Sequence, residues 1–263
     1  MQRLYNLRMN TTKTITCKNC GNEFTGNYCN ICGQSAHTHD INFHFIWHDI
    51  QHGLLHLEKG ILYTIKELFI RPGHSVKEYI DGKRINHFKP ISLVLLLAGL
   101  YVFLLHTFDL HQIPLVSTTT EGSVKLDVSG FIRSIEEHYS ISQILFLPIF
   151  SLASYLAFKK FKLSYIKHLV LNAFILVQRL VVKILFVPLL YAYNGTSKMN
   201  IVIGITNLIG FAFAFWTLGQ FFKDKSTFKT ILRCISFFFL FLFQMIVIVV
   251  FYFFISKALG KMW

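Results

Sequence analysis

The chain has 263 residues, of which 53% are hydrophobic and 15% are charged, and its mean hydropathy is +0.49. Because soluble domains carry about 25% charged residues, this composition excludes an ordinary soluble protein and predicts a membrane protein. The formal net charge of +13 would also fit a nucleic-acid-binding protein, so the positions of the basic residues must decide between these classes.

Two Cys-x-x-Cys-Gly turns near the N-terminus contain four of the five cysteines. The glycine after each pair permits the positive φ with which backbone N–H groups point at the sulfurs. Two such turns predict a zinc ribbon over residues 1–36, with one Zn²⁺ among four thiolates. We expect Phe24 and Tyr28 to fill its small interior. The predicted metal ligands are Cys17, Cys20, Cys29 and Cys32.

The alternatives for these cysteines are two disulfides or a redox-active pair. The topology derived below places the segment in the cytosol, where disulfides rarely persist. A segment this short cannot bury a core of its own, so its fold needs the metal. Because a closed four-thiolate site has no open coordination position, the zinc is expected to be structural.

Residues 42–70 are predicted to form one amphipathic helix that ends before Pro72 and Gly73. Large apolar side chains gather on one side of it, and four histidines gather on the other. In the segment of residues 37–90 this pattern predicts a helix lying in the membrane interface. Imidazoles four residues apart can share a metal ion. The alternative is a merely polar face, since no His-Glu-x-x-His motif is present. The candidate second metal ligands are His44, His48, His52 and His56.

A short helix is predicted over residues 74–80, with Asp81 and Gly82 at its exit. Lys83 and Arg84 then lie at the membrane surface. They are candidate contacts for a lipid phosphate. The simpler alternative is that their charges only anchor the chain on the cytosolic side.

Several short motifs resemble, in order and spacing, those of a known family. They are the second cysteine turn with the Gln34 that follows it, residues 62–68, Arg71-Pro72-Gly73, residues 78–84 and Lys89-Pro90. From residue 17 to about residue 105 the chain is similar to a bacterial family known as domain of unknown function 3667. The resemblance implies a multi-pass inner-membrane protein with an N-terminal zinc ribbon, and it implies no particular activity.

Five stretches reach or approach the roughly 18–20 apolar residues that are needed to cross a hydrocarbon core about 30 Å thick. The third stretch is interrupted by Gln178, Arg179 and Lys183. The sequence therefore predicts an all-α integral membrane bundle over residues 91–263, with about five transmembrane helices. The predicted spans are residues 91–108, 141–158, 168–193, 200–222 and 231–256.

Lysine and arginine are concentrated in alternate connections between these spans. Residues 77–89, 159–167 and 223–233 are rich in them, whereas residues 109–140 and 194–199 hold few. The positive-inside rule then predicts a cytoplasmic N-terminus and an external C-terminus in a bacterial inner membrane. Most of the excess charge serves orientation and contact with anionic headgroups. No basic stripe interleaved with aromatic residues remains, so the expected partner is the bilayer and not nucleic acid.

Arg179 lies near the middle of the third predicted span, and Lys183 lies one turn further along the same face. A charge at this depth costs at least about 2.5–3.5 kcal/mol on insertion scales, so it must face protein, water or a ligand. No Asp or Glu lies inside any predicted span, which leaves amides and carbonyls, such as those of Gln178, Asn207 and Gln244, as expected partners. An anion or a lipid phosphate would suit Arg179. The alternative is a structural arginine bonded to backbone carbonyls.

These features favour a non-enzymatic scaffold, assembly factor or signalling component whose cytosolic zinc ribbon docks a protein partner. One alternative is a small transporter or flippase-like protein that handles an anionic or lipid group at Arg179. Another is a membrane metalloenzyme that uses the histidine stripe. The sequence assigns no catalytic residue, and it leaves the oligomeric state open.

Overall fold

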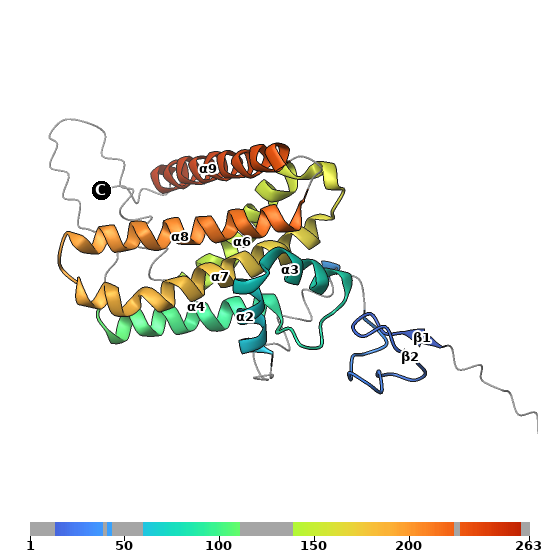
Figure 1. Ribbon diagram of the computed structural model, residues 1–263. Coiled ribbons are helices and arrows are strands. Elements are labelled where there is room, and N and C mark those ends of the chain that lie inside the picture. The colour runs from blue at the N-terminus through green and yellow to red at the C-terminus, as the bar shows by residue number, and fades with distance from the viewer. Residues whose placement is uncertain (1–13, 39–40, 44–59, 111–138, 224–226, 259–263) are drawn as a thin grey trace, which may run out of the picture.

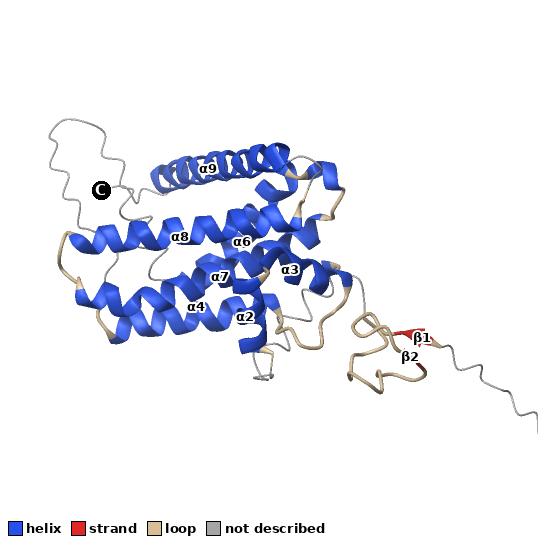
Figure 2. Ribbon diagram, in the orientation of Figure 1, coloured by secondary structure: helices blue, strands red, loops and turns tan. Residues whose placement is uncertain are grey.

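The computed structural model describes residues 14–38, 41–43, 60–110, 139–223 and 227–258. Within this part of the chain, strands occur only in the N-terminal ribbon, and the rest is helical (Figure 2). The long helices lie alongside one another, and the ribbon stands beyond one end of them (Figure 1). The elements are β1 (Ile15–Thr16), β2 (Glu23–Phe24), α2 (Ile61–Ile70), α3 (Pro72–Asp81), α4 (Pro90–Thr107), α6 (Tyr139–Ala157), the short 3₁₀ helix η1 (Lys159–Phe161), α7 (Tyr165–Ala192), α8 (Lys198–Phe221) and α9 (Thr227–Ala258).

Four helices are long and apolar enough to cross a membrane: α4, α7, α8, and α9 over Thr227–Tyr252. A fifth helix, α6, is apolar but shorter over Ile141–Ala157. Each predicted span coincides with one of these five helices to within a few residues. The prediction of an apolar helix bundle is thus confirmed. By length and composition, four spans rather than five are found among the described residues.

Helix α7 lies at the centre of the bundle and packs against α4, α6 and α8. Of its most apolar stretch, 56% of the residues are buried, against 11% for α9, which packs mainly on α6. Phe174 and Leu180 are almost fully buried on α7. The span that the sequence marks as least uniformly apolar is therefore the one that is best covered by protein.

The lysine-rich connections meet at one end of the bundle. Phe158, just before η1, stacks on Phe222, just after α8, with ring centroids 4.1 Å apart. At the other end, the Asn194 side chain donates a hydrogen bond to the carbonyl oxygen of Asp109 at 3.2 Å. The helices therefore alternate in direction as the charge pattern requires, and the ribbon stands at the end where α7 begins (Figure 1).

The predicted helix over residues 42–70 is only partly observed. Its last ten residues form α2, which begins after Gly60, so the expectation of one helix continuing through residue 60 is wrong. Glycine is a poor helix former, and a Cβ at Gly60 would lie 2.8 Å from the carbonyl oxygen of Asn86. The histidine stripe lies in residues 44–59, outside the described residues. In Figure 1, α2 crosses the long helices at a large angle near the end that carries the ribbon.

Pro72 and Gly73 allow the turn between α2 and α3 to pack closely against α7 and α8. Proline has no N–H, so it cannot bond the carbonyl oxygen of Leu68, its expected partner in a helix. Gln178 of α7 supplies the missing donor, with its Nε2 atom 2.7 Å from that oxygen. A Cβ at Gly73 would lie 2.4 Å from the backbone nitrogen of Phe221 on α8, so only glycine allows this close approach.

Candidate metal centre

Each cysteine turn is built by backbone hydrogen bonds that the Cys-x-x-Cys-Gly spacing makes available. In the first turn the N–H of Gly21 donates to the carbonyl oxygen of Cys17 at 2.9 Å, and in the second the N–H of Gly33 donates to that of Cys29 at 2.8 Å. The two glycines have φ values of 75° and 76°, in the left-handed region that favours glycine. The sequence repeat is thus a structural repeat, and each turn presents two sulfurs on the same side.

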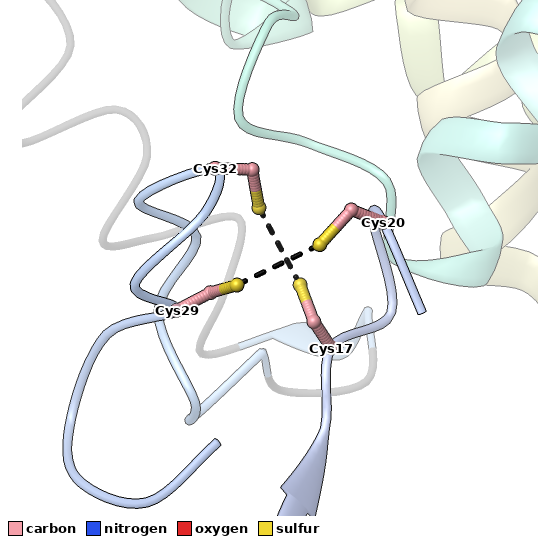
Figure 3. Close-up of side chains that lie close together, drawn as sticks. All are labelled: Cys17, Cys20, Cys29 and Cys32. Atoms are coloured by element: carbon pink, nitrogen blue, oxygen red, sulfur yellow. Dashed lines mark hydrogen bonds between the residues drawn. The ribbon is translucent and has the colours of Figure 1, made fainter. Parts of the chain in front are cut away.

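The four sulfurs converge, and each close pair joins the two turns (Figure 3). The sulfur of Cys17 is 3.5 Å from that of Cys32, and the sulfur of Cys20 is 3.6 Å from that of Cys29. All four ligand atoms lie within 4.8 Å of one another, and all four are free thiols rather than disulfides. A tetrahedron with metal–sulfur bonds of 2.3 Å has edges of about 3.8 Å. The cluster therefore has the dimensions needed to hold one tetrahedral metal ion.

The protonation of the thiols also favours a cation among them. A hydrogen bond from the backbone of Cys32 is the largest influence on Cys29 and lowers the pKa of that thiol to about 6. A backbone hydrogen bond from Asn22 acts to lower the pKa of Cys20, but burial and the neighbouring sulfurs outweigh it and raise that pKa to about 12. All four groups can therefore be thiolates together only when a positive ion balances their charge.

The interior of the ribbon is smaller than the sequence predicts. Phe24 is buried and packs with Cys17 and Cys29 as expected. Tyr28 is 68% exposed, so the expectation that it fills the interior is wrong. It pairs with Ser35 in an isolated antiparallel bridge, where neighbouring side chains point to opposite faces. Since Cys29 points inward, Tyr28 points out, and Ile31 in the same turn is also exposed.

Gln34 fastens the ribbon to the segment that follows α3. Its side chain is buried, and its Nε2 atom donates to the carbonyl oxygen of Gly82 at 2.9 Å. Its Oε1 atom accepts hydrogen bonds from the backbone N–H groups of Arg84 at 3.1 Å and Ile85 at 3.3 Å. One glutamine thus satisfies three backbone groups some fifty residues away in sequence. From the sequence, Gln34 is recognisable only as part of the family resemblance, which does not predict this role. Its place directly after the second turn is the one signal that pointed to it.

Lys83 and Arg84 both turn toward protein groups. The Nζ atom of Lys83 is 3.5 Å from a carboxylate oxygen of Glu78. The Nε atom of Arg84 donates to the carbonyl oxygen of Tyr79 at 3.1 Å, and its guanidinium carbon lies 5.3 Å from the Tyr79 ring centroid. Both side chains therefore have protein partners, and a contact with a lipid phosphate stays a prediction.

Arg71 joins α2 to α3 through two carboxylates, and no pattern in the sequence predicted this contact. It forms ion pairs with Glu67 and with Glu78, the second at 3.1 Å. Burial alone would raise the pKa of Glu78, but the hydrogen bond and charge of Arg71 outweigh it and lower that pKa. This ion cluster lies at the turn between α2 and α3, where Gly73 packs closely against α8.

His87 lies in an aromatic enclosure beneath this cluster. Its ring is 5.2 Å from that of Tyr63 and 5.8 Å from that of Tyr79, both edge to face. Its Nδ1 atom is buried and has no hydrogen-bond partner among the described residues. Burial lowers its pKa more than the charges of Glu67 and Glu78 raise it, so the neutral imidazole is favoured.

One family model matches this segment of the chain, and the match does not extend to the cysteines. The model described as a protein of unknown function (DUF3667) matches residues 58–102. That stretch contains α2, α3, the backbone groups that Gln34 binds, and most of α4. No curated protein and no solved structure matches the chain. The chain therefore contains a domain of unknown function, and the comparisons assign it no activity.

Proposed function

We propose that this chain is a bacterial inner-membrane protein with five spans whose cysteine cluster holds one structural zinc ion. In this proposal the ribbon is a rigid cytosolic docking platform, and the protein works as a non-enzymatic scaffold, assembly factor or signalling component. The observation that carries the proposal is the buried side chain of Gln34, which fixes the ribbon to the segment after α3. A freely tethered metal module would need no such contact.

The chemistry of the metal site supports a binding role over a catalytic one. Four thiolates fill a tetrahedral coordination shell and leave no position for a substrate or a reactive water. The exposed Tyr28 and Ile31 lie on the outer side of the second turn. Aromatic and aliphatic side chains on a rigid platform are well suited to contact a protein partner. A metalloenzyme that uses His44, His48, His52 and His56 stays a hypothesis from sequence alone.

The proposed topology treats α6 as a fifth span. Helix α6 has 19 residues, packs against α4, α7 and α9, and runs between the two ends of the bundle. Counting it places the lysine-rich end, and with it the ribbon, in the cytosol. A cytosolic reporter should be active at the N-terminus and inactive when fused after Trp263. Activity at both ends would contradict five spans.

Metal analysis of the purified full-length chain tests the zinc site. We expect one zinc per chain, and loss of that zinc in Cys29→Ser. Cys234→Ser is the matched control, because Cys234 is buried in α9 away from the ribbon, and it should keep the metal. A wild-type chain without zinc, or a Cys29→Ser chain that retains it, would contradict the assignment.

Hydrogen exchange at the backbone of Arg84 and Ile85 tests whether the ribbon is fixed. In Gln34→Ala we expect these two amides to exchange at least tenfold faster while the zinc is kept, because the acceptor that protects them is gone. Removal of zinc by a chelator should produce the same increase. Asn30→Ala, which removes only an exposed bond to Asn22, is the control. Unchanged exchange in Gln34→Ala would mean that the ribbon is not held by this contact.

A further inference from the structure

One face of α7 carries a row of polar side chains through the bundle. His168, Asn172, Arg179 and Lys183 are spaced by four, seven and four residues, which places them within a narrow arc of a helix. The Oγ atom of Ser154 on α6 is 3.0 Å from the Nδ1 atom of His168. Lys183 lies over the ring of Tyr101 on α4, its Nζ atom 5.4 Å from the centroid. The row therefore faces protein along its length.

Arg179, at the middle of this row, has a distinct environment. Its guanidinium carbon lies 5.7 Å from the ring centroid of Phe150 on α6 and 5.5 Å from that of Phe211 on α8. On α8 the side chain passes Gly210, where a Cβ would come within 3.3 Å of its Cγ atom. The absence of a side chain at Gly210 is what gives the arginine room between the two helices.

The guanidinium has no hydrogen-bond acceptor within the described part of the chain. Of the three amides expected to serve, that of Gln178 is instead bonded to Leu68 and Thr217, so the expectation is wrong for Gln178. No carboxylate occurs in α4, α6, α7, α8 or α9. The two rings offset part of the cost of a half-buried cation, but they accept none of its five N–H donors in the plane of the guanidinium.

A small cavity lies beside this group. It has a volume of about 30 Å³, and Asn172 and Arg179 are its polar lining residues. Phe150 and Phe211, together with Phe237 and Phe241 of α9, form much of the remaining wall. This volume admits about two water-sized groups. A second cavity of about 40 Å³ adjoins Lys183 on the outer half of the same face.

We propose that Arg179 binds a phosphate group through two of its oxygens, which enter the cavity between α6, α7, α8 and α9. The planar fork of a guanidinium matches two oxygens of such a group, and the cavity has the size to hold them. The apolar walls suit the hydrocarbon next to the headgroup of an amphipathic anion, and α9 is the wall that is least held by protein. The proposal goes beyond the docking function and does not depend on the zinc ribbon.

Native mass spectrometry and thermal unfolding of the full chain in neutral detergent test the site. Phosphatidylglycerol provides the lipid source of the anion, inorganic phosphate provides the soluble source, and phosphatidylcholine is the neutral reference. We expect an anionic probe to stabilise and bind the wild type. In Arg179→Gln the apparent affinity should fall at least tenfold, and Arg179→Lys should recover part of it. A response to phosphatidylglycerol alone identifies a lipid as the source, and a response to phosphate as well identifies a soluble oxyanion.

Two further variants keep the test decisive if Arg179→Gln fails to fold. Ala214 lines the cavity and is buried, so Ala214→Val should fill the space and weaken binding at least tenfold while the arginine stays. Lys198→Gln, which removes a cation over the ring of Tyr193 at the outer end of α8, should bind as the wild type does. Wild-type affinity in Arg179→Gln or in Ala214→Val would overturn the proposal, as would failure of both anionic probes to bind the wild type better than phosphatidylcholine does.

Discussion

Helices α7 and α9 are both long and apolar, yet they hold opposite positions in the molecule. The most apolar stretch of α9 has the higher mean hydropathy, 2.8 against 2.2, but only 11% of its residues are buried against 56% for α7. Lipid tails solvate Leu and Phe as well as protein does, so apolar character gives a span little reason to be central. Polar and charged groups need partners that lipid cannot provide. The polar residues of α7 therefore favour a central position for that helix. Because α9 is almost uniformly apolar, it can lie at the periphery in contact with lipid.

Truncation of a large side chain on each helix should show the difference between α7 and α9 most strongly. Phe174 of α7 is 1% exposed and lies against Tyr79 with ring centroids 5.1 Å apart, whereas Phe243 of α9 is 64% exposed. Phe174→Ala should lower the free energy of unfolding by about 3–5 kcal/mol, because it leaves a cavity. Phe243→Ala should change it by less than about 0.5 kcal/mol. Denaturant unfolding in mixed micelles measures both, and equal losses would show that α9 is as tightly packed as α7.

The two helices also offer a matched pair of glutamines. Gln178 of α7 donates to the orphan carbonyl of Leu68 and accepts a hydrogen bond from Thr217 at 2.8 Å. In Gln244 of α9, the buried Oε1 atom has no partner among the described residues. Gln178→Leu should therefore cost about 1–3 kcal/mol, since it leaves the buried carbonyl of Leu68 unpaired, while the Thr217 hydroxyl can still donate to the carbonyl oxygen of Phe213 at 2.9 Å.

Gln244→Leu should be neutral or slightly stabilising, because it removes an unpaired group rather than a bond. The same unfolding assay applies to both variants. A large loss in Gln244→Leu would mean that this face of α9 meets a polar partner within the membrane.

The smallest effect is expected at His87, which packs near Phe174 where the segment of residues 58–102 meets α7. The folded-state pKa of His87 lies below its ordinary value of 6.5 because burial disfavours the imidazolium. Its contribution to stability is therefore present above about pH 6.5 and is lost as the pH falls through the folded-state pKa, by up to about 1.4 kcal/mol per pH unit.

His87→Phe should keep the aromatic contacts with Tyr63 and Tyr79 and should lose less stability than the wild type between pH 7 and pH 5. Unfolding curves recorded across that pH range provide the measurement. His74→Phe, at an exposed position on α3, is the control and should follow the wild type. If the stability of His87→Phe changes with pH in parallel with that of the wild type, the pKa of His87 is the same in the folded and unfolded states.

Local patterns in the sequence predicted local structure well. The cysteine spacing identified four sulfurs that do converge, because a Cys-x-x-Cys-Gly turn is closed by its own backbone. Gly82, with φ at 112°, marked the end of α3. Prediction failed where the outcome depended on distant neighbours. The sequence predicts that Tyr28 fills the ribbon interior, which is too small to hold it. It also predicts one helix over residues 42–70, although the chain around Asn86 approaches Gly60 closely.

The sequence by itself determined the class of protein, the bounds of the apolar helices, the alternation of charge between their ends, and the four candidate metal ligands. All of these depend on composition or on residues within one turn of each other. Only the tertiary structure decided that α7 is central, that Gln178 bonds to Leu68 rather than to Arg179, and that Gln34 holds the ribbon to Gly82, Arg84 and Ile85. The physical reason is that buried polar groups must be paired, while the identity of a distant partner depends on how the whole chain packs.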